Sequence, residues 1–401
     1  MGSAADNIAA QGEARNFEGH PMLPQADHDE YAQQAFVLSL KQLVNGPFLD
    51  ATKSVCKSKL AEELGMDDSP APEARHQVRK MMQATPAYKI WSSLLFNSQE
   101  LLWDYVGESV DRQLDSLNER ATSVQPPLGS LTVDPDFSLP PYLAAIDNHI
   151  MPGGYGEVIA DNDVRPGAVY DRGTALYHMG QVNLLNDVRG HTLAAFLQDT
   201  VGEVKPLRIL DMGCTIGHST TVLCDYFPDA EIHAIDVGAS LLRYAHARAE
   251  HLGKAIHFSQ QSAESTNFES GSFDMVVSSA MFHETSTAAV PRIMAECARL
   301  LRPGGIVVHA EVPVRYNRMA KSEVLIRDWQ TYNNAEPFWG GCATTDFEAA
   351  LADAGFVDLH VGYQPATRDA NDPKRGKFTQ DGDASFRYWY LFGGKKPEIK
   401  E

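Results

Sequence analysis

The chain has 401 residues, of which 34 are basic and 53 acidic, and its formal net charge is −19. A surface this acidic repels nucleic acids and anionic membranes, so we expect neither as a partner. The length exceeds that of one minimal domain, and 43% hydrophobic residues is a proportion typical of globular chains with a sizeable core.

The cysteines and the N-terminus indicate where the protein works. The five cysteines show neither disulfide nor metal-ligand spacing, which is typical of a reducing compartment (Cys56, Cys214, Cys224, Cys297 and Cys342). Residues 1–20 have no apolar core and no basic flank, so they do not resemble a signal peptide. No apolar run reaches the roughly 18–20 residues that a membrane span needs. The sequence therefore predicts a cytoplasmic protein.

The first half of the chain is predicted to be helical. Residues 1–27 are polar and lack periodicity, which predicts a flexible tail. Residues 28–200 are expected to form a helical N-terminal domain that caps the active site, shapes the substrate site or forms a homodimer interface. Its first apolar face consists of Phe36, Leu40, Leu43 and Val44. Within this domain, residues 151–173 are rich in glycine and proline and predict a long loop that serves as a lid or else is an irregular connector.

Residues 201–401 are expected to form a second domain with a different pattern. Between residues 207 and 311, five short apolar strands alternate with helical or loop stretches. This alternation indicates parallel βαβ units, and so an α/β fold with a doubly wound sheet. Two later runs, GFVDLHVGY and RYWYLFGG, are expected to complete the sheet as an antiparallel pair at one edge.

The run LDMGCTIGHS, residues 210–219, predicts a ligand site at a strand end. Asp211 ends a buried strand, and glycines at 213 and 217 let the backbone approach a ligand. Their G-x-x-x-G spacing differs from the dinucleotide fingerprint, and no Walker lysine follows. The acidic residue before the turn suits a ligand that carries an ammonium group and no phosphate. Asp236 ends the next strand, where a carboxylate commonly accepts ribose hydroxyls, so a nucleoside site is predicted.

Four runs in order resemble successive motifs of class I S-adenosylmethionine-dependent methyltransferases, in particular the ubiquinone/menaquinone-methyltransferase-like small-molecule group. They are LDMGCTIGHST, AIDVGASLLRYAHARA, QQSAESTNFESGSFDMVVSSAMFHE and ECARLLRPGGIVVHAEVP. The resemblance covers about a quarter of the chain strongly. It implies a Rossmann-like sheet, S-adenosylmethionine as the cofactor, and in-line methyl transfer to a small organic metabolite.

The resemblance also implies which residues hold the cofactor. The methionine and sulfonium part would lie along Asp211, Gly213, Cys214 and Gly217. The nucleoside part would lie along Asp236 at the ribose, Val237 beside the adenine, Ala263 and Glu264 along the adenine edge, and Ser279. Ser262 stands where family members often carry aspartate, so Glu264 is the alternative partner of the adenine amino group. From the lid, Tyr170 is the candidate to face the sulfonium by cation–π attraction, beside Tyr155 and Tyr177.

Methyl transfer needs positioning and desolvation, and it needs a general base only if the acceptor must lose a proton. His283 and Glu284 follow the fourth strand and are the candidates for that base, or else a hydrogen-bonded pair in a loop. Glu311 near the end of the fifth strand is expected to reach the substrate. The aromatic and amide residues of 329–339 suit a pocket for an organic acceptor, or else a helix that packs its aromatic residues into the core. The candidates there are Tyr332, Asn333 and Trp339.

Two other functions are compatible with the same motifs. One is an enzyme that uses S-adenosylmethionine for a non-methyl reaction, such as intramolecular cyclisation or lyase chemistry. The other is a non-catalytic module that only binds the cofactor. No metal site is predicted, because the fourteen histidines show no metal-ligand spacing.

Overall fold

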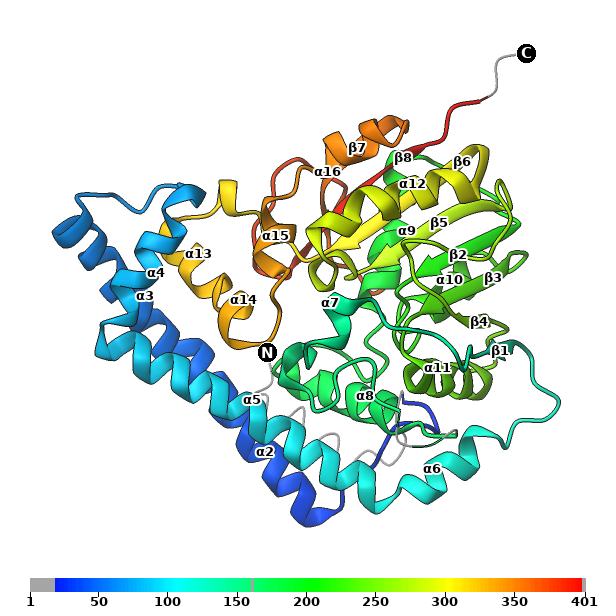
Figure 1. Ribbon diagram of the computed structural model, residues 1–401, viewed down its shortest axis with the longest axis horizontal. Helices are drawn as coiled ribbons and strands as arrows, with labels where there is room; N and C mark the ends of the chain where they lie inside the picture. Colours follow the sequence, from blue (N-terminus) through cyan, green and yellow to red (C-terminus); the bar gives the residue numbers. More distant parts are fainter. Residues whose placement is uncertain (1–18, 159, 161, 399–401) are drawn as a thin grey trace.

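An eight-stranded sheet forms the centre of the C-terminal half in the computed structural model, which describes residues 19–158, 160 and 162–398 (Figure 1). The strands lie in the order β1-β4-β3-β2-β5-β6-β8-β7. Their bounds are β1 (Ser130–Thr132), β2 (Arg208–Met212), β3 (Glu231–Asp236), β4 (His257–Gln260), β5 (Phe273–Ser279), β6 (Leu301–Glu311), β7 (Val357–Pro365) and β8 (Tyr388–Lys395).

The pairing of these strands confirms a doubly wound sheet. The strands from β1 to β6 pair in parallel, and β8 is antiparallel to both β6 and β7. The two late strands thus form the expected antiparallel pair at one edge. The strand order reverses between β2 and β5, and ligands of doubly wound sheets bind at such a switch point. The strand β1 was not predicted, and it extends the opposite edge from within the helical half of the chain.

Helices cover both faces of the sheet. Along β2, Ile209 points into one apolar core, whereas Leu210 and Met212 point into the other. This alternation follows from the two-residue period of a strand. One face carries α9 (Val188–Thr200), α10 (Thr220–Tyr226) and α11 (Ala239–His251), and the other carries α12 (Val290–Leu300) and α16 (Phe347–Asp353). Because α9 packs on β6, β7 and β8, the domain boundary predicted at residue 200 falls too late.

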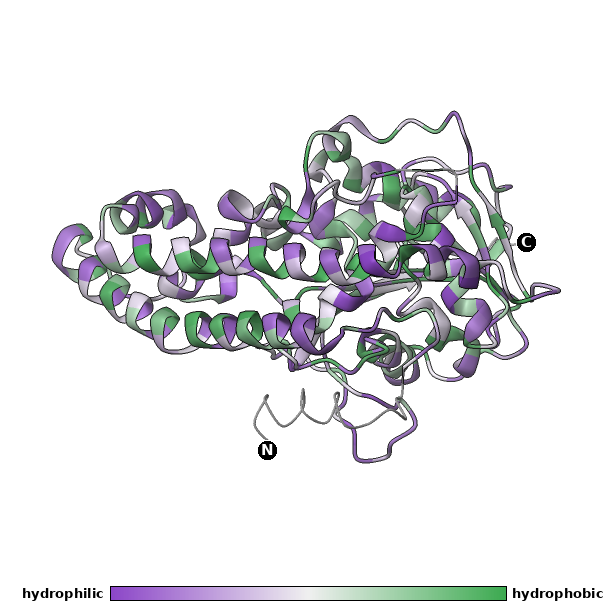
Figure 2. Cartoon of the chain, turned by 90° about the horizontal axis from the view of Figure 1, so that it is seen from below, coloured by the Kyte–Doolittle hydropathy of each residue, from purple (hydrophilic) through white to green (hydrophobic). Residues whose placement is uncertain are grey.

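Seven other helices of the described residues form a helical unit that projects from the sheet (Figures 1 and 2). Its long helices carry mixed hydrophobic and hydrophilic residues along their length (Figure 2). The unit consists of α2 (His28–Leu43), α3 (Leu49–Lys59), α4 (Arg75–Gln83), α5 (Pro86–Arg112) and α6 (Leu114–Ala121), joined by α13 (Lys321–Arg327) and α14 (Trp329–Asn333). Leu325 and Trp329 share an apolar core with Val44 and Trp91. The helical unit is therefore completed by the C-terminal half of the chain, which the predicted domains did not include.

The prediction of a flexible tail over residues 1–27 is wrong for residues 20, 22 and 23. Residues 1–18 lie outside the described part, but His20, Met22 and Leu23 are buried. The Tyr244 hydroxyl donates to the carbonyl of Met22 at 2.9 Å, and His20 Nε2 lies 2.8 Å from the Asp171 carboxylate. His20 and Met22 are thus packed inside the protein, where they pair with the buried polar groups of Asp171 and Tyr244.

The predicted lid loop of residues 151–173 is also shorter than expected, because α8 spans Arg165–Tyr177. Pro166 stands in its first turn, where proline is compatible with a helix. The helix α2 forms as predicted, but two members of its predicted apolar face are wrong. Phe36 and Leu43 are 58% and 48% exposed, whereas Lys41 is 3% exposed. No helix in the described part of the chain is both long and apolar enough to cross a membrane.

Leu325→Ala should lower the free energy of unfolding of the helical unit by about 2–5 kcal/mol, because it leaves a cavity in the core shared by α13 and the N-terminal helices. Leu43→Ala, on the exposed side of α2, should change it by less than about 0.5 kcal/mol. Urea unfolding followed by tryptophan fluorescence compares the two variants. Equal changes in the free energy of unfolding for the two variants would contradict a core shared by α13 and the N-terminal helices.

Candidate active site

A cavity of about 860 Å³ lies where the carboxyl ends of the parallel strands meet the helical unit. Asp211, Asp236 and Ser279 line it from the ends of β2, β3 and β5. Lys41 and Trp103 line it from α2 and α5. The volume is in the range of small-molecule sites. The helical unit thus forms part of the cavity wall.

The turn after β2 brings backbone close to this cavity. Gly213 has φ +70°, and a Cβ atom there would lie 2.7 Å from Met281 Cγ, so only glycine fits. The backbone N–H groups of Gly213 and Cys214 donate to the carbonyl of Ile235 at 2.8 and 3.0 Å. Gly213 and Cys214 line the cavity, whereas Gly217 shapes the turn behind it with φ +77°.

Asp211 offers a free oxygen to a ligand. The Thr220 hydroxyl donates to Asp211 Oδ2 at 2.6 Å, whereas the buried Oδ1 has no hydrogen-bond partner among the described residues. Burial raises the pKa of Asp211 to about 7, the nearby Asp236 adds to this, and the Thr220 hydroxyl opposes it. A donor such as an ammonium group would satisfy Oδ1 and stabilise the carboxylate, so this end of the cavity fits the expected methionine part.

Asp236 is held in place at the end of β3. Its oxygens accept hydrogen bonds from the backbone N–H groups of Thr215 at 2.8 Å and Gly238 at 3.0 Å. Burial raises the pKa of Asp236, and these backbone donors oppose the rise. The fixed carboxylate lines the cavity, where it can accept ribose hydroxyls.

The expected adenine residues lie together on the cavity wall: Val237, Ser262, Ala263 and Glu264. Glu264 is already engaged, because its two oxygens accept from the Tyr142 hydroxyl at 2.8 Å and from Arg292 Nε at 2.6 Å. This engagement makes Glu264 a weak alternative for the adenine amino group. Ser279 accepts a hydrogen bond from the Ser219 hydroxyl at 3.1 Å, next to the same cavity.

Tyr170 also lines the cavity, and it comes from α8 instead of a loop. Its ring lies over His218, with centroids 6.0 Å apart and planes at 32°, and its edge meets the Tyr155 ring. The predicted cation–π role of Tyr170 stays a prediction; its ring lies on the cavity wall.

The three expected catalytic residues form one connected group. His283 and Glu284 line the cavity after β5, while Glu311 lies behind them and is 1% exposed. Glu311 Oε1 lies 2.5 Å from His283 Nδ1, and Oε2 accepts from the backbone N–H of Phe282 at 2.8 Å. Glu311 therefore orients the His283 ring and does not reach the cavity, in contrast to the expectation that it contacts the substrate.

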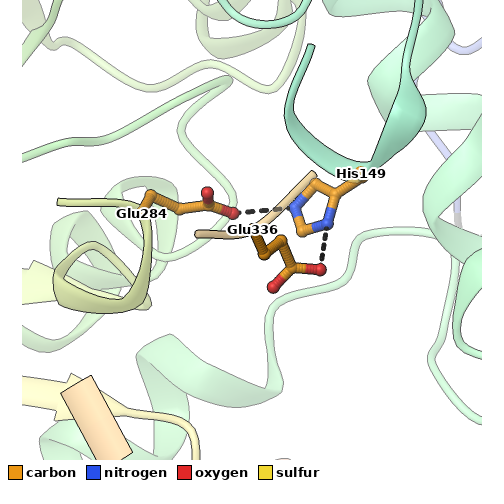
Figure 3. A group of neighbouring side chains, drawn as sticks. All are labelled: His149, Glu284 and Glu336. Atoms are coloured by element: carbon orange, nitrogen blue, oxygen red, sulfur yellow. Dashed lines mark hydrogen bonds and ion pairs between the residues drawn. The ribbon is translucent and has the colours of Figure 1, made fainter. Parts of the chain in front are cut away.

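Glu284 meets a histidine that the sequence analysis missed. His149 Nε2 lies 2.9 Å from Glu284 Oε1, and His149 Nδ1 lies 2.9 Å from Glu336 Oε1 (Figure 3). The Tyr155 hydroxyl donates to Glu284 Oε1 at 3.2 Å, and Asn148 donates to its other oxygen. A lone histidine in a glycine-rich stretch carries no spacing signal, so only the tertiary structure reveals this cluster.

The charges in this group stabilise one another. Burial would lower the pKa of His149, but Glu336 and Glu284 outweigh it and raise that pKa well above its usual value. Burial likewise opposes protonation of His283, yet Glu311 and Glu284 raise its pKa to about 9. Burial would raise the pKa of Glu284, but His149 and His283 lower it to about 2. At neutral pH both imidazoles are therefore cationic and act as hydrogen-bond donors.

The structure places one of the three predicted substrate residues on the cavity wall and the other two away from it. Trp339, in α15 (Trp339–Thr344), lines the cavity, with its ring edge-on to the His283 ring and the centroids 5.3 Å apart. Tyr332 is 45% exposed and lies under the Arg79 guanidinium, and neither it nor Asn333 lines the cavity. The helix α14 turns the other side inward, so Trp329, Gln330 and Asn334 take the places expected of Tyr332 and Asn333.

Residues 209–305 match the family model described as the methyltransferase domain. The chain is 31% identical over 129 residues to malonyl-[acyl-carrier protein] O-methyltransferase of Methylococcus capsulatus, covering 29% of this chain and 45% of that protein. It is 31% identical over 115 residues to demethylmenaquinone methyltransferase of Thermus thermophilus, covering 29% of this chain and 51% of that protein. The chain thus spans about half the length of these curated relatives.

Among solved structures, phosphoethanolamine N-methyltransferase 2 of Haemonchus contortus is 20% identical with a TM-score of 0.38, and the match covers 51% of this chain and 52% of that one. This likeness is too distant to bear on function. The matched family confirms the resemblance seen in the sequence motifs: residues 209–305 are a class I S-adenosylmethionine-dependent methyltransferase domain.

Lys41 is buried in the cavity wall, where its ammonium lies 2.5 Å from Gln99 Oε1, and burial lowers its pKa from 10.5 to about 7. The unfolded chain therefore binds more protons between these two values, and the free energy of unfolding rises with pH across that window. Lys41→Met should remove this slope. We expect it to raise the thermal midpoint more at about pH 6.5 than at about pH 9.5, because the desolvated ammonium is lost.

Thermal unfolding at the two pH values measures the effect. Lys205→Met is the matched control, because the Lys205 side chain is 84% exposed, and it should change neither midpoint appreciably. A gain from Lys41→Met that is the same at both pH values would contradict the assigned burial effect.

Proposed function

We propose that the protein transfers the methyl group of S-adenosylmethionine to a small organic acceptor bound in the cavity. The observation that carries the proposal is the continuity of one cavity. It joins the strand-end residues Asp211 and Asp236 to the acceptor-side residues His283, Glu284 and Trp339. A cofactor held at the strand ends would therefore present its methyl group toward the side chains that face an acceptor.

The residues at the strand ends would hold the cofactor. Asp211 Oδ1 would bind its ammonium group, and Asp236 would accept the ribose hydroxyls. The Gly213 turn leaves room for its methionine part, and Val237 and Ala263 would flank the adenine. When bound, this cofactor supplies a methyl group that is already activated. The protein then contributes position and exclusion of water.

The helical unit and α14–α15 would form the acceptor side. Trp103, Trp329 and Trp339 give this side an apolar surface, and Gln330 and Asn334 add polar groups that can orient an acceptor. His283 and Glu284 would contact the acceptor, while Glu311 is a positioning residue that holds the His283 ring. The cavity wall formed by α2 and α5 supports the cap role of these helices over the dimer-interface role.

The cellular location and the partners of the protein are also part of this proposal. We place it in the cytoplasm with no nucleic-acid or membrane partner, on the support of its net charge of −19 and five free cysteines. A homodimer stays a prediction.

Mass spectrometry of the products tests the methyl transfer. The purified protein is incubated with S-adenosylmethionine, alone and with a metabolite extract. We expect S-adenosylhomocysteine only when the extract is present. Methylthioadenosine formed without an acceptor would instead assign a cyclisation or lyase reaction, and binding without any turnover would assign a non-catalytic module.

Asp236→Asn should weaken S-adenosylmethionine binding about tenfold or more, because the ribose loses a charged hydrogen-bond acceptor. Isothermal titration calorimetry measures this change. Asp229→Asn is the control, because Asp229 is an exposed carboxylate just before the same strand and should leave the affinity unchanged. Equal affinities of the two variants would place the nucleoside elsewhere.

The affinity for S-adenosylmethionine should rise roughly tenfold between about pH 6 and about pH 8. Asp211 has a pKa of about 7 in the free protein, so its carboxylate is mostly protonated at the lower pH and mostly ionised at the higher one. Only the ionised form pairs with the ammonium group of the cofactor. Calorimetric titrations across this range should show the rise in the wild type and a flat profile in Asp211→Asn. A rise that persists in the variant would show that another group is responsible.

A further inference from the structure

Three buried side chains from distant parts of the sequence converge at the acceptor side of the cavity: His149, Glu284 and Glu336 (Figure 3). One ligand atom from each lies within 4.8 Å of the other two. Around a first-row ion with bonds of about 2.0–2.2 Å, tetrahedral ligand atoms lie roughly 3.4 Å apart. Movements of about 1 Å would therefore bring all three side chains to bonding distance.

The charges of the cluster are unbalanced without a cation. His283 lies between Glu311 and Glu284, and His149 lies between Glu284 and Glu336, so two imidazoles face three carboxylates. No lysine or arginine in the described ranges forms an ion pair with Glu284 or Glu336. Even a protonated His149 leaves one negative charge in excess, and a buried excess charge is costly. A divalent ion beside a neutral imidazole would cancel both carboxylates.

Glu336 supplies a second, independent indication of a ligand. The residue is fully buried, and its Oε1 contacts His149 and accepts from Asn334 Nδ2 at 2.5 Å. The other oxygen, Oε2, is buried and has no hydrogen-bond partner among the residues the structure covers. Buried polar atoms nearly always have a partner, and a cation bound at the cluster would supply the one that this oxygen lacks.

We propose that His149, Glu284 and Glu336 bind a divalent first-row transition ion through one ring nitrogen and one oxygen of each carboxylate. Imidazole and carboxylate donors without a thiolate suit Mn²⁺, Fe²⁺, Co²⁺ or Zn²⁺. His149 and Glu284 line the cavity, so an ion there would keep open positions toward a bound molecule. Three protein ligands with an open position are typical of catalytic metal sites. An ion held in this way would favour an acceptor that can bind it through an oxygen atom.

Cobalt titration of the full-length, tag-free protein after chelator treatment tests this site. Calorimetry should show one Co²⁺ bound per chain, with visible absorption bands of a low-symmetry site. Glu284→Gln and Glu336→Gln should each weaken binding about 100-fold. Glu264→Gln is the matched control, because it neutralises another cavity carboxylate that is paired with Tyr142 and Arg292, and it should bind Co²⁺ as the wild type does.

The outcomes separate this inference from methyl transfer. Circular dichroism and thermal midpoints establish that each variant is folded. Asp236→Asn should keep full Co²⁺ binding while it loses cofactor affinity, because the two sites use different residues. Absence of Co²⁺ binding by the wild type, or wild-type affinity in either Glu284→Gln or Glu336→Gln, would overturn the three-ligand site without affecting the proposed methyl transfer.

Discussion

Buried carboxylates need partners in a low-dielectric interior, and in this protein that requirement joins the sheet to the helical unit. Glu311 at the end of β6 pairs with His283, and Glu284 is the residue after His283 in the chain. His149 in turn lies between Glu284 and Glu336 and pairs with both. Loss of either imidazole leaves a carboxylate without its partner. The cluster therefore links the segment around His149, the end of β5 and the connection between α14 and α15. The cavity forms where these three segments meet.

Burial acts on both ends of that cavity in the same way, by favouring neutral forms. Asp211 at the cofactor end and Lys41 at the helical end are both driven to pKa values of about 7, one from below and the other from above. Each side chain can thus gain or lose its charge near neutral pH when a ligand supplies a partner. Because the interior screens charge poorly, such a pairing is stronger than the same contact in water. The site gains selectivity for charged ligand groups from this desolvation.

The sequence predicts those parts of the protein that local chemistry decides. The strand ends at Asp211 and Asp236 follow from short apolar runs and a glycine turn, which are local patterns in the sequence. The face of α2 could not be predicted, because periodicity assumes an apolar interior, whereas this helix buries Lys41 against Gln99 at the cavity wall and exposes Phe36. His149 could not be predicted for another reason. Its partners lie far away in sequence, and no spacing rule connects them.

The matched domain and the rest of the chain line different parts of the cavity, so similarity to the relatives does not indicate which acceptor this cavity binds. The match ends at residue 305, and the strand-end residues of the cofactor side lie inside it. Of the acceptor side, only His283 and Glu284 lie inside, while Lys41, Trp103 and Trp339 lie outside. The helical unit also takes α13 and α14 from beyond residue 305. For the proposed methyl transfer, we therefore expect residues outside the matched domain to decide which acceptor binds.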